Sequence, residues 1–129
     1  MSVKGSCLCG KVTLEVGSFD RDVVACHCAQ CRKQSGHHFA ATRAQNSELT
    51  IHGEEHLKWY RASGTAARGF CQHCGSTLFW RHDGTAHTSI LAGCLEAPTG
   101  LKLDRHIFAA DKGDYYELKD DVKIYPQAD

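Results

Sequence analysis

The 129-residue sequence has no excess of charge of either sign, since 15 Lys and Arg residues balance 15 Asp and Glu residues. Proteins that bind nucleic acids through the phosphates usually carry a basic excess, so this composition gives no support for such a partner. The sequence also lacks an apolar run long enough to cross a bilayer, and residues 1–5 contain no apolar secretion signal core. We therefore expect a cytoplasmic protein with no nucleic-acid or membrane partner.

Long helical periodicity is absent as well, because no stretch repeats its apolar residues at helical spacing over three turns. Short alternating segments separated by turn residues predict strands instead. Two pairs of such segments favour hairpins, 57–61 with 65–70 and 78–81 with 87–91. The length suits one domain, so we expect a small, mostly-β single domain over residues 1–129.

Cysteine, in contrast, is abundant, with eight residues that include two Cys-x-Cys pairs. Four disulfides are one possible interpretation. The missing secretion signal argues against disulfides, because a reducing compartment keeps thiols free, and such tight spacing is more typical of metal ligands than of bridge partners. We therefore favour metal sites, most plausibly for zinc.

The most concentrated group is Cys26, Cys28 and Cys31, three thiols within six positions. Thiolates hold zinc in tetrahedral geometry, so three protein ligands leave one coordination position open. An open position is where zinc performs chemistry, and we therefore predict a catalytic zinc on these three cysteines.

The remaining ligand-like cysteines form two short motifs, Cys7-Leu8-Cys9-Gly10 and Cys71-Gln72-His73-Cys74-Gly75. If the first motif continues a strand, Cys7 and Cys9 lie on one face and their sulfurs can reach one ion. Together the motifs predict a closed four-thiolate zinc site with a structural role. His73 is an alternative ligand, but Cys74 competes better for zinc at this spacing.

Three polar residues adjoin the Cys26 group. His27 should face away from Cys26 and Cys28, so we interpret it as a neighbouring or surface histidine and not as a ligand. Arg32 and Lys33 either balance the thiolate charge or attract an anionic substrate, and only one of the two is expected to reach the pocket.

Cys94 is the eighth cysteine and belongs to neither group. Its possible roles are a small core residue, a fourth ligand to the open zinc, or a redox thiol. A buried core position is the commonest fate of such a residue, and we favour it.

The ordered motifs at residues 7–10, 26–33 and 71–75 strongly resemble the glutathione-dependent formaldehyde-activating enzyme and centromere protein V family, and residues 92–95 and 106–108 resemble its later landmarks. The resemblance covers residues 5–116. It implies a β-tent fold of stacked short antiparallel sheets with two zinc ions, one structural and one catalytic. The structural ion would be held by Cys7, Cys9, Cys71 and Cys74, and the catalytic ion by Cys26, Cys28 and Cys31. The implied reaction joins glutathione and formaldehyde, and in reverse it is a carbon–sulfur lyase reaction.

Three thiolates make zinc a modest Lewis acid, better suited to holding a substrate thiolate than to producing hydroxide. We therefore hypothesise that a small thiol adds to a small aldehyde at this site, with His27, His37 or His38 passing the proton. A zinc-stabilised binding module, in which Cys94 or a histidine closes the second site, is one alternative. A redox enzyme that uses Cys94 is another, although it would need a resolving cysteine.

Overall fold

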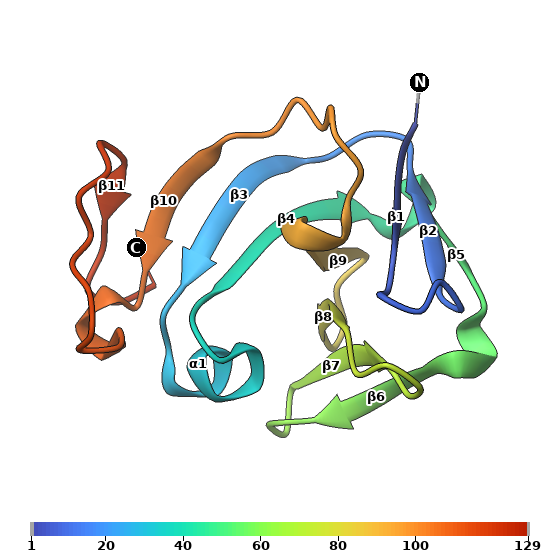
Figure 1. Cartoon of the computed structure of the whole chain (residues 1–129), viewed down its shortest axis with the longest axis horizontal. Coiled ribbons are helices and arrows are strands. Elements are labelled where there is room, and N and C mark those ends of the chain that lie inside the picture. The colour runs from blue at the N-terminus through green and yellow to red at the C-terminus, as the bar shows by residue number, and fades with distance from the viewer. Residues whose placement is uncertain (1, 129) are drawn as a thin grey trace.

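The computed structural model describes residues 2–128, which form two β-sheets and one short α-helix (Figure 1). Met1 and Asp129, the ends of the expected single domain, lie outside the described residues. The smaller sheet has the order β1-β2-β5 and the larger one β11-β10-β3-β4-β9-β8-β7-β6. The strands are β1 (Val3–Ser6), β2 (Thr13–Val16), β3 (Arg21–Cys26), β4 (Phe39–Gln45), β5 (Leu49–His52), β6 (Leu57–Arg61), β7 (Ala66–Cys71), β8 (Thr77–His82), β9 (His87–Leu91), β10 (Leu103–Ile107) and β11 (Lys123–Ile124). The α-helix is α1 (Ala29–Ser35), and short 3-10 helices span Asn46–Glu48, Glu54–His56, Ala92–Cys94 and Ala109–Asp111.

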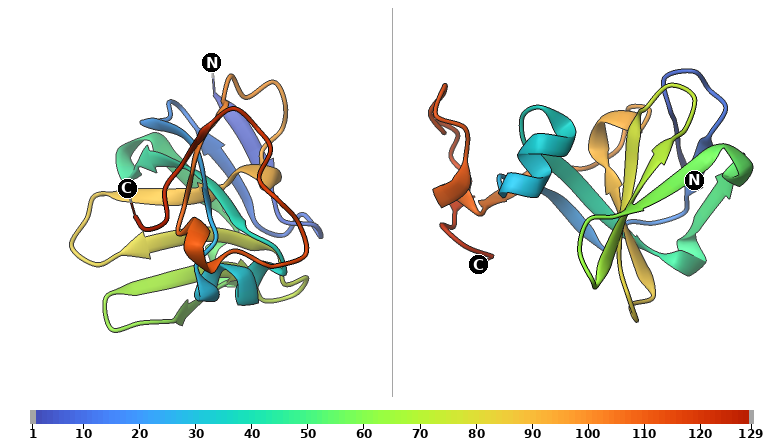
Figure 2. Two further views of the ribbon diagram at one scale, coloured as in Figure 1. Left: turned by 90° about the vertical axis from the view of Figure 1, so that its left-hand side faces the viewer. Right: turned by 90° about the horizontal axis from the view of Figure 1, so that it is seen from below.

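The mostly-β fold of stacked sheets is confirmed, and so are both predicted hairpins. β6 pairs antiparallel with β7, and β8 pairs antiparallel with β9. One edge of the larger sheet is parallel instead, because β10 pairs parallel with β3 and β11 pairs parallel with β10. The chain returns to this edge after the loop 95–102 (Figure 2), so β10 runs in the same direction as β3.

The two faces of the larger sheet are used differently. One face packs on the smaller sheet around a core that combines β2 residues such as Leu14 with Leu78, Phe79 and Ile90. The opposite face carries a second, smaller cluster of Cys31, Phe39 and Ala41, against which Trp80 and Leu91 pack. Neighbouring side chains enter different clusters, Phe79 and Trp80 on β8 and Ile90 and Leu91 on β9, as the pleat of a sheet requires. Leu78 joins the same cluster as Phe79 where the pairing of β7 with β8 shifts register. The second face is therefore available for a site.

Two local predictions differ from the structure. The strand expected to carry Cys7 and Cys9 ends earlier, at Ser6, so both cysteines lie in the turn between β1 and β2. Residues 34–36, whose composition predicts a turn or a single helical turn, lie at the end of the seven-residue helix α1. The Cys28 sulfur caps the start of α1 by accepting from the backbone N–H of Cys31, and Gly36 ends it in a left-handed conformation, φ 85°.

The C-terminal segment 119–128 takes part in the fold and is not a peripheral tail. β11 adds a strand to the edge of the larger sheet, and the carboxylate of Asp120 accepts a hydrogen bond from His106 at 2.8 Å. Within residues 2–128, no helix is long and apolar enough to span a membrane.

Candidate metal centres

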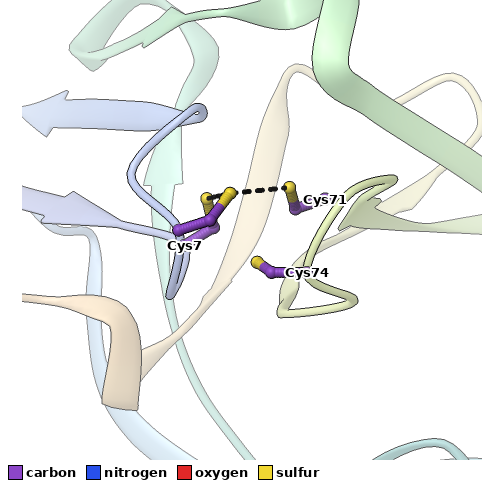
Figure 3. A group of neighbouring side chains, drawn as sticks. Cys7, Cys71 and Cys74 are labelled. Carbon is purple, nitrogen blue, oxygen red and sulfur yellow. Dashed lines mark hydrogen bonds between the residues drawn. The ribbon is translucent and has the colours of Figure 1, made fainter.

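Four cysteine sulfurs from two distant turns meet between the sheets. Cys7 faces Cys71 and Cys74 across a small gap (Figure 3), and one ligand atom from each of Cys7, Cys9, Cys71 and Cys74 lies within 4.8 Å of the others. The Sγ atoms of Cys7 and Cys9 are 3.6 Å apart, and those of Cys9 and Cys71 are 3.7 Å apart. A tetrahedron with zinc–sulfur bonds of about 2.3 Å has edges of about 3.8 Å. The four sulfurs therefore fit a tetrahedral zinc ion.

Each pair of cysteines sits in a tight turn that a glycine completes. Gly10 and Gly75 adopt left-handed conformations, with φ of 80° and 79°, which glycine adopts without steric cost. In these turns the N–H of Gly10 donates to the carbonyl of Cys7, and the N–H of Gly75 donates to the carbonyl of Cys71. The turns also contact each other, because the N–H of Leu8 donates to the Ser76 hydroxyl at 2.9 Å. The glycines that follow the cysteines thus shape the two turns.

The second cluster comes from one short segment. Cys26 ends β3, Cys28 caps α1, and Cys31 lies in the first turn of α1. Their sulfurs also lie within 4.8 Å of one another. The cluster borders a pocket of about 370 Å³ on the free face of the larger sheet. Most of the pocket wall is apolar, and its members are Val24, Phe39, Ala41, Ala66, Trp80, Ile107 and Phe108, with Arg21, Gln30, Ser63, Thr65, Arg68 and Ser89 as the polar residues.

The three thiols of this cluster compete for negative charge. A hydrogen bond from Cys31 lowers the pKa of Cys26, whereas the contact with Cys26, together with burial, raises the pKa of Cys31. Neighbouring thiolates repel each other, so a cation that shares the site favours the charged form of both Cys26 and Cys31. The guanidinium of Arg68 supplies part of that charge, because its Nη2 lies 3.6 Å from the Cys31 sulfur. A soft divalent cation among the three sulfurs fits this donor set.

Among the described residues, no fourth Cys, His, Asp or Glu joins the three-cysteine cluster. Cys94 lies elsewhere, packed against the core that contains Cys7. Burial raises the pKa of the Cys94 thiol to about 12, so the side chain is a protonated thiol at neutral pH. Cys94 is partly buried and packs against the core, so it comes close to the expected core role without full burial, and it does not close the second cluster.

The histidines near the cluster are turned away from the pocket. His27 is fully buried, as its orientation away from the cysteines required. Its Nε2 bonds Nδ1 of His106 at 2.8 Å, and its Nδ1 bonds the Tyr116 hydroxyl at 2.9 Å. With both imidazoles neutral, Asp120 accepts from His106, His106 accepts from His27, and His27 accepts from Tyr116. Burial lowers the pKa of His27 to about 4, which keeps its ring neutral.

The expected proton transfer by a histidine therefore finds no support in this geometry. None of His27, His37 and His38 lines the pocket. His27 instead secures the loop between Cys26 and Cys28, because its backbone N–H also donates to the carbonyl of Ile107 at 3.0 Å.

The positively charged residues at the pocket are not the ones that the sequence predicted. Neither Arg32 nor Lys33 lines it, and Lys33 faces an adjoining groove beside Tyr60. The arginines that do line the pocket are Arg21 from β3 and Arg68 from β7. Sequence reasoning missed both. Strand alternation offered a signal for Arg68, since it shares a face of β7 with Ala66, which lines the same pocket.

Comparisons with known proteins agree with this arrangement. The chain is 25% identical to a Schizosaccharomyces pombe protein named an uncharacterized lyase, over 95% of this chain and 89% of that protein. It is 34% identical to a putative glutathione-dependent formaldehyde-activating enzyme of Halomonas elongata, over 61% of this chain and 55% of that protein. The chain thus spans little more than half the length of the Halomonas relative. A crystal structure of a Rhodobacter sphaeroides protein superposes with a TM-score of 0.63 at 29% identity, covering 73% of this chain and 88% of that one.

A family profile also matches most of the chain. The profile described as glutathione-dependent formaldehyde-activating enzyme matches residues 2–111, a range that contains both cysteine clusters. The relatives named as a lyase and as a formaldehyde-activating enzyme agree with that match. The chain belongs to the glutathione-dependent formaldehyde-activating enzyme family.

Proposed function

We propose that the protein is a zinc-dependent carbon–sulfur lyase-type enzyme that joins a small, glutathione-like thiol to a small aldehyde such as formaldehyde. The observation that carries this proposal is the contrast between the two clusters: the four-cysteine cluster is complete, whereas the three-cysteine cluster has no fourth ligand within residues 2–128 and borders a pocket. A complete set of ligands is typical of structural zinc, and an incomplete set beside a pocket is typical of catalytic zinc.

In this proposal Cys26, Cys28 and Cys31 hold the catalytic zinc, and Cys7, Cys9, Cys71 and Cys74 hold the structural one. When bound, the catalytic zinc supplies a site at which a substrate thiol persists as a thiolate at neutral pH. In the reaction a sulfur–carbon bond forms, the aldehyde carbonyl becomes a hydroxyl group, and the proton given up by the thiol ends on that hydroxyl.

The chain's own residues contribute orientation and charge. The apolar wall that contains Phe39 and Trp80 excludes water from the substrates and restricts their orientation, which raises their effective concentration. Arg68 is buried, holds its guanidinium over the ring of Phe39, and offsets the thiolate charge at Cys31.

Two wider parts of the proposal follow from the same chemistry. Seven thiolate ligands require a compartment that keeps cysteines reduced, so we place the protein in the cytoplasm. Because Cys9, in the turn between β1 and β2, and Cys71, at the end of β7, come from the two different sheets, we treat residues 1–129 as a single zinc-binding domain.

The test combines metal analysis with turnover in the Cys26→Ser variant. We expect wild-type protein to hold two zinc ions per chain, and Cys26→Ser to hold one and to lose adduct formation by about a hundredfold or more. Thiols add to formaldehyde without help, so the rate should be measured by NMR exchange at low reactant concentration, with the uncatalysed rate subtracted.

Cys94→Ser is the matched control, expected to keep both ions and the wild-type rate. If Cys26→Ser lost one zinc ion but formed the adduct at the wild-type rate, the second cluster would be structural and the proposed reaction would be wrong.

A further inference from the structure

Arg21 reaches the three-cysteine pocket because of an irregularity in β3. In a regular strand, Val24 and Cys26 would share their face with residue 22, and residue 21 would point to the other face. The pairing of β3 with β4 shifts register between Arg21 and Val24. Such a bulge re-aims the side chains beyond it. As a result Arg21, Val24 and Cys26 all line the same pocket.

The guanidinium of Arg21 has few partners for a partly buried cation. Its Nη2 donates to the Ala41 carbonyl at 3.4 Å, and its Nε is buried without a hydrogen-bond partner among the described residues. Burial, followed by the nearby positive charges of Arg43 and Arg105, lowers the pKa of Arg21, and the smaller opposite effects of Asp20 and Cys26 do not cancel this. A partly buried cation that no carboxylate contacts is costly, so this position favours a negatively charged ligand.

The neighbouring arginine, on β4, has the carboxylate partner that Arg21 lacks in the described part of the chain. Arg43 lies directly opposite Arg21 in the sheet, and its Nε donates to the Asp20 carboxylate at 2.8 Å. No ion pair of this kind joins Arg21 to a carboxylate within residues 2–128. The two arginines lie opposite each other in the sheet, but only Arg43 forms an ion pair with a carboxylate among these residues.

Arg68, the other arginine of the pocket, is already engaged. Its Nη1 donates to Gln34 at 2.9 Å, and its Nη2 lies against Gln30 and the Cys31 sulfur, although its Nε, like that of Arg21, has no hydrogen-bond partner among the described residues. Its charge therefore serves the cysteine cluster. Arg21 stands in the same pocket as the cluster, with its charge available to a ligand.

We propose that Arg21 binds the carboxylate of a small substrate whose reacting atom lies at the three-cysteine cluster. This inference rests on the proposed function and specifies its substrate class. Because one pocket of about 370 Å³ contains both Arg21 and the cysteines, the substrate is short. The carboxylate belongs either to the thiol, as in mercaptoacetate, or to the aldehyde, as in glyoxylate.

The experiment compares matched substrates on the zinc-loaded protein. Mercaptoacetate is compared with 2-mercaptoethanol, each with formaldehyde, and glyoxylate is compared with formaldehyde, each with 2-mercaptoethanol. We expect one of the two carboxylate pairs to have a kcat/KM about tenfold to a hundredfold above its neutral match, as a charge-assisted hydrogen bond supplies. The arm that shows this preference identifies the substrate that carries the carboxylate.

The variants assign the preference to a residue. Arg21→Gln should remove the preference, whereas Arg43→Gln, in the same row but outside the pocket, should keep it. If thermal melting shows that Arg21→Gln is unfolded, Arg21→Lys replaces it and should keep only part of the preference, because lysine lacks the planar fork. A preference that survives Arg21→Gln, or turnover without any preference, would overturn the proposal.

A binding measurement separates this proposal from the reaction itself. Trp80 lines the pocket, so its fluorescence reports on ligands there. We expect acetate, but not acetamide, to change the tryptophan fluorescence of the wild-type protein, and Arg21→Gln to abolish that change. If no thiol and aldehyde pair were turned over but this response appeared, the carboxylate site would stand and the proposed reaction would be wrong. A response that Arg21→Gln leaves unchanged would overturn the site.

Discussion

The two cysteine clusters use the same ligand type in opposite ways. The four-cysteine cluster joins turns that are far apart in the chain, and its Cys7 and Cys71 are almost completely buried. The three-cysteine cluster comes from one segment of six residues and borders a pocket. A metal that links distant turns restrains the whole fold, whereas a metal held by one segment restrains only that segment. The difference in chain position is consistent with the structural and catalytic roles proposed for the two clusters.

The surroundings of the clusters differ in the same sense. Around the four-cysteine cluster, backbone and small polar groups contact the sulfurs, for example the Val12 N–H that donates to the Cys7 sulfur at 3.3 Å, and Cys7 and Cys71 also pack in the main core. Around the three-cysteine cluster they are a charged arginine and an apolar pocket wall. The first environment only satisfies the sulfurs, whereas the second can also receive a ligand.

Removing a ligand from each cluster should have very different effects on stability. We expect Cys71→Ser to lower the free energy of unfolding by more than about 5 kcal/mol, which is comparable to the whole stability of a small domain. The reason is that the zinc contact between the two sheets would be lost together with a buried ligand. Thermal melting and zinc analysis of the purified variant measure the effect.

The matched variant is Cys28→Ser in the three-cysteine cluster. Serine is a good N-cap for α1, so the loss should be confined to the binding energy of the open-site zinc. That loss is about 3 kcal/mol or less when free zinc is a hundredfold above its dissociation constant. Equal destabilisation by Cys71→Ser and Cys28→Ser would contradict the division into a structural and a functional cluster.

Much of this contrast could be predicted from the sequence, because short cysteine spacing survives most changes of local structure. The structure brings together the same seven cysteines that the spacing grouped. It does so although the strand predicted to carry Cys7 and Cys9 ends before them. Two thiols separated by one residue can reach a common point from a turn as well as from a strand. The hairpins were predictable for a similar reason, since alternation and turn residues are local signals.

The polar residues of the pocket were not predictable in this way. Arg21 depends on a register shift in β3, and a shift of one residue exchanges the faces of a strand. Arg68 lies more than 35 positions after Cys31 and contacts it only through the order of strands in the sheet. Arg32 and Lys33 were predicted instead because they follow Cys31 directly in the sequence, but their positions on α1 keep them out of the pocket lining. Long-range pairing decides such contacts, and it leaves no local pattern.

The hydrogen bonds that link Asp120, His106 and His27 behind the three-cysteine cluster allow a prediction of an intermediate effect on zinc affinity. Asp120→Ala removes the acceptor for His106, which in turn supports His27 between two of the cysteines. We expect the affinity of the open cluster for zinc to fall about tenfold, because residues that orient a metal site from behind contribute to its affinity. Competition with a chromophoric chelator measures this affinity, and the four-cysteine cluster should be unchanged.

Asp121→Ala is the control for this test, because it removes the exposed neighbouring carboxylate. It should leave both affinities at their wild-type values. A loss shared equally by the two clusters in Asp120→Ala would indicate general destabilisation, and a loss in neither would show that these hydrogen bonds do not position the cysteines.

The smallest effect is expected at Cys94, the one cysteine outside both clusters. Its thiol packs against the core, so Cys94→Ser places a hydroxyl in an apolar environment and should cost about 1 kcal/mol with both zinc ions retained. For a chain of this length, that loss lowers Tm by about 3–5 °C. The burial that raises the pKa of Cys94 to about 12 also keeps it a protonated thiol at pH 8, so iodoacetamide should modify it slowly in the zinc-loaded protein. Mass spectrometry measures that rate. Rapid modification would show that the thiol is accessible and ionised, and the loss of a zinc ion in Cys94→Ser would show that this residue supports the four-cysteine cluster beside it and is not simply a core residue.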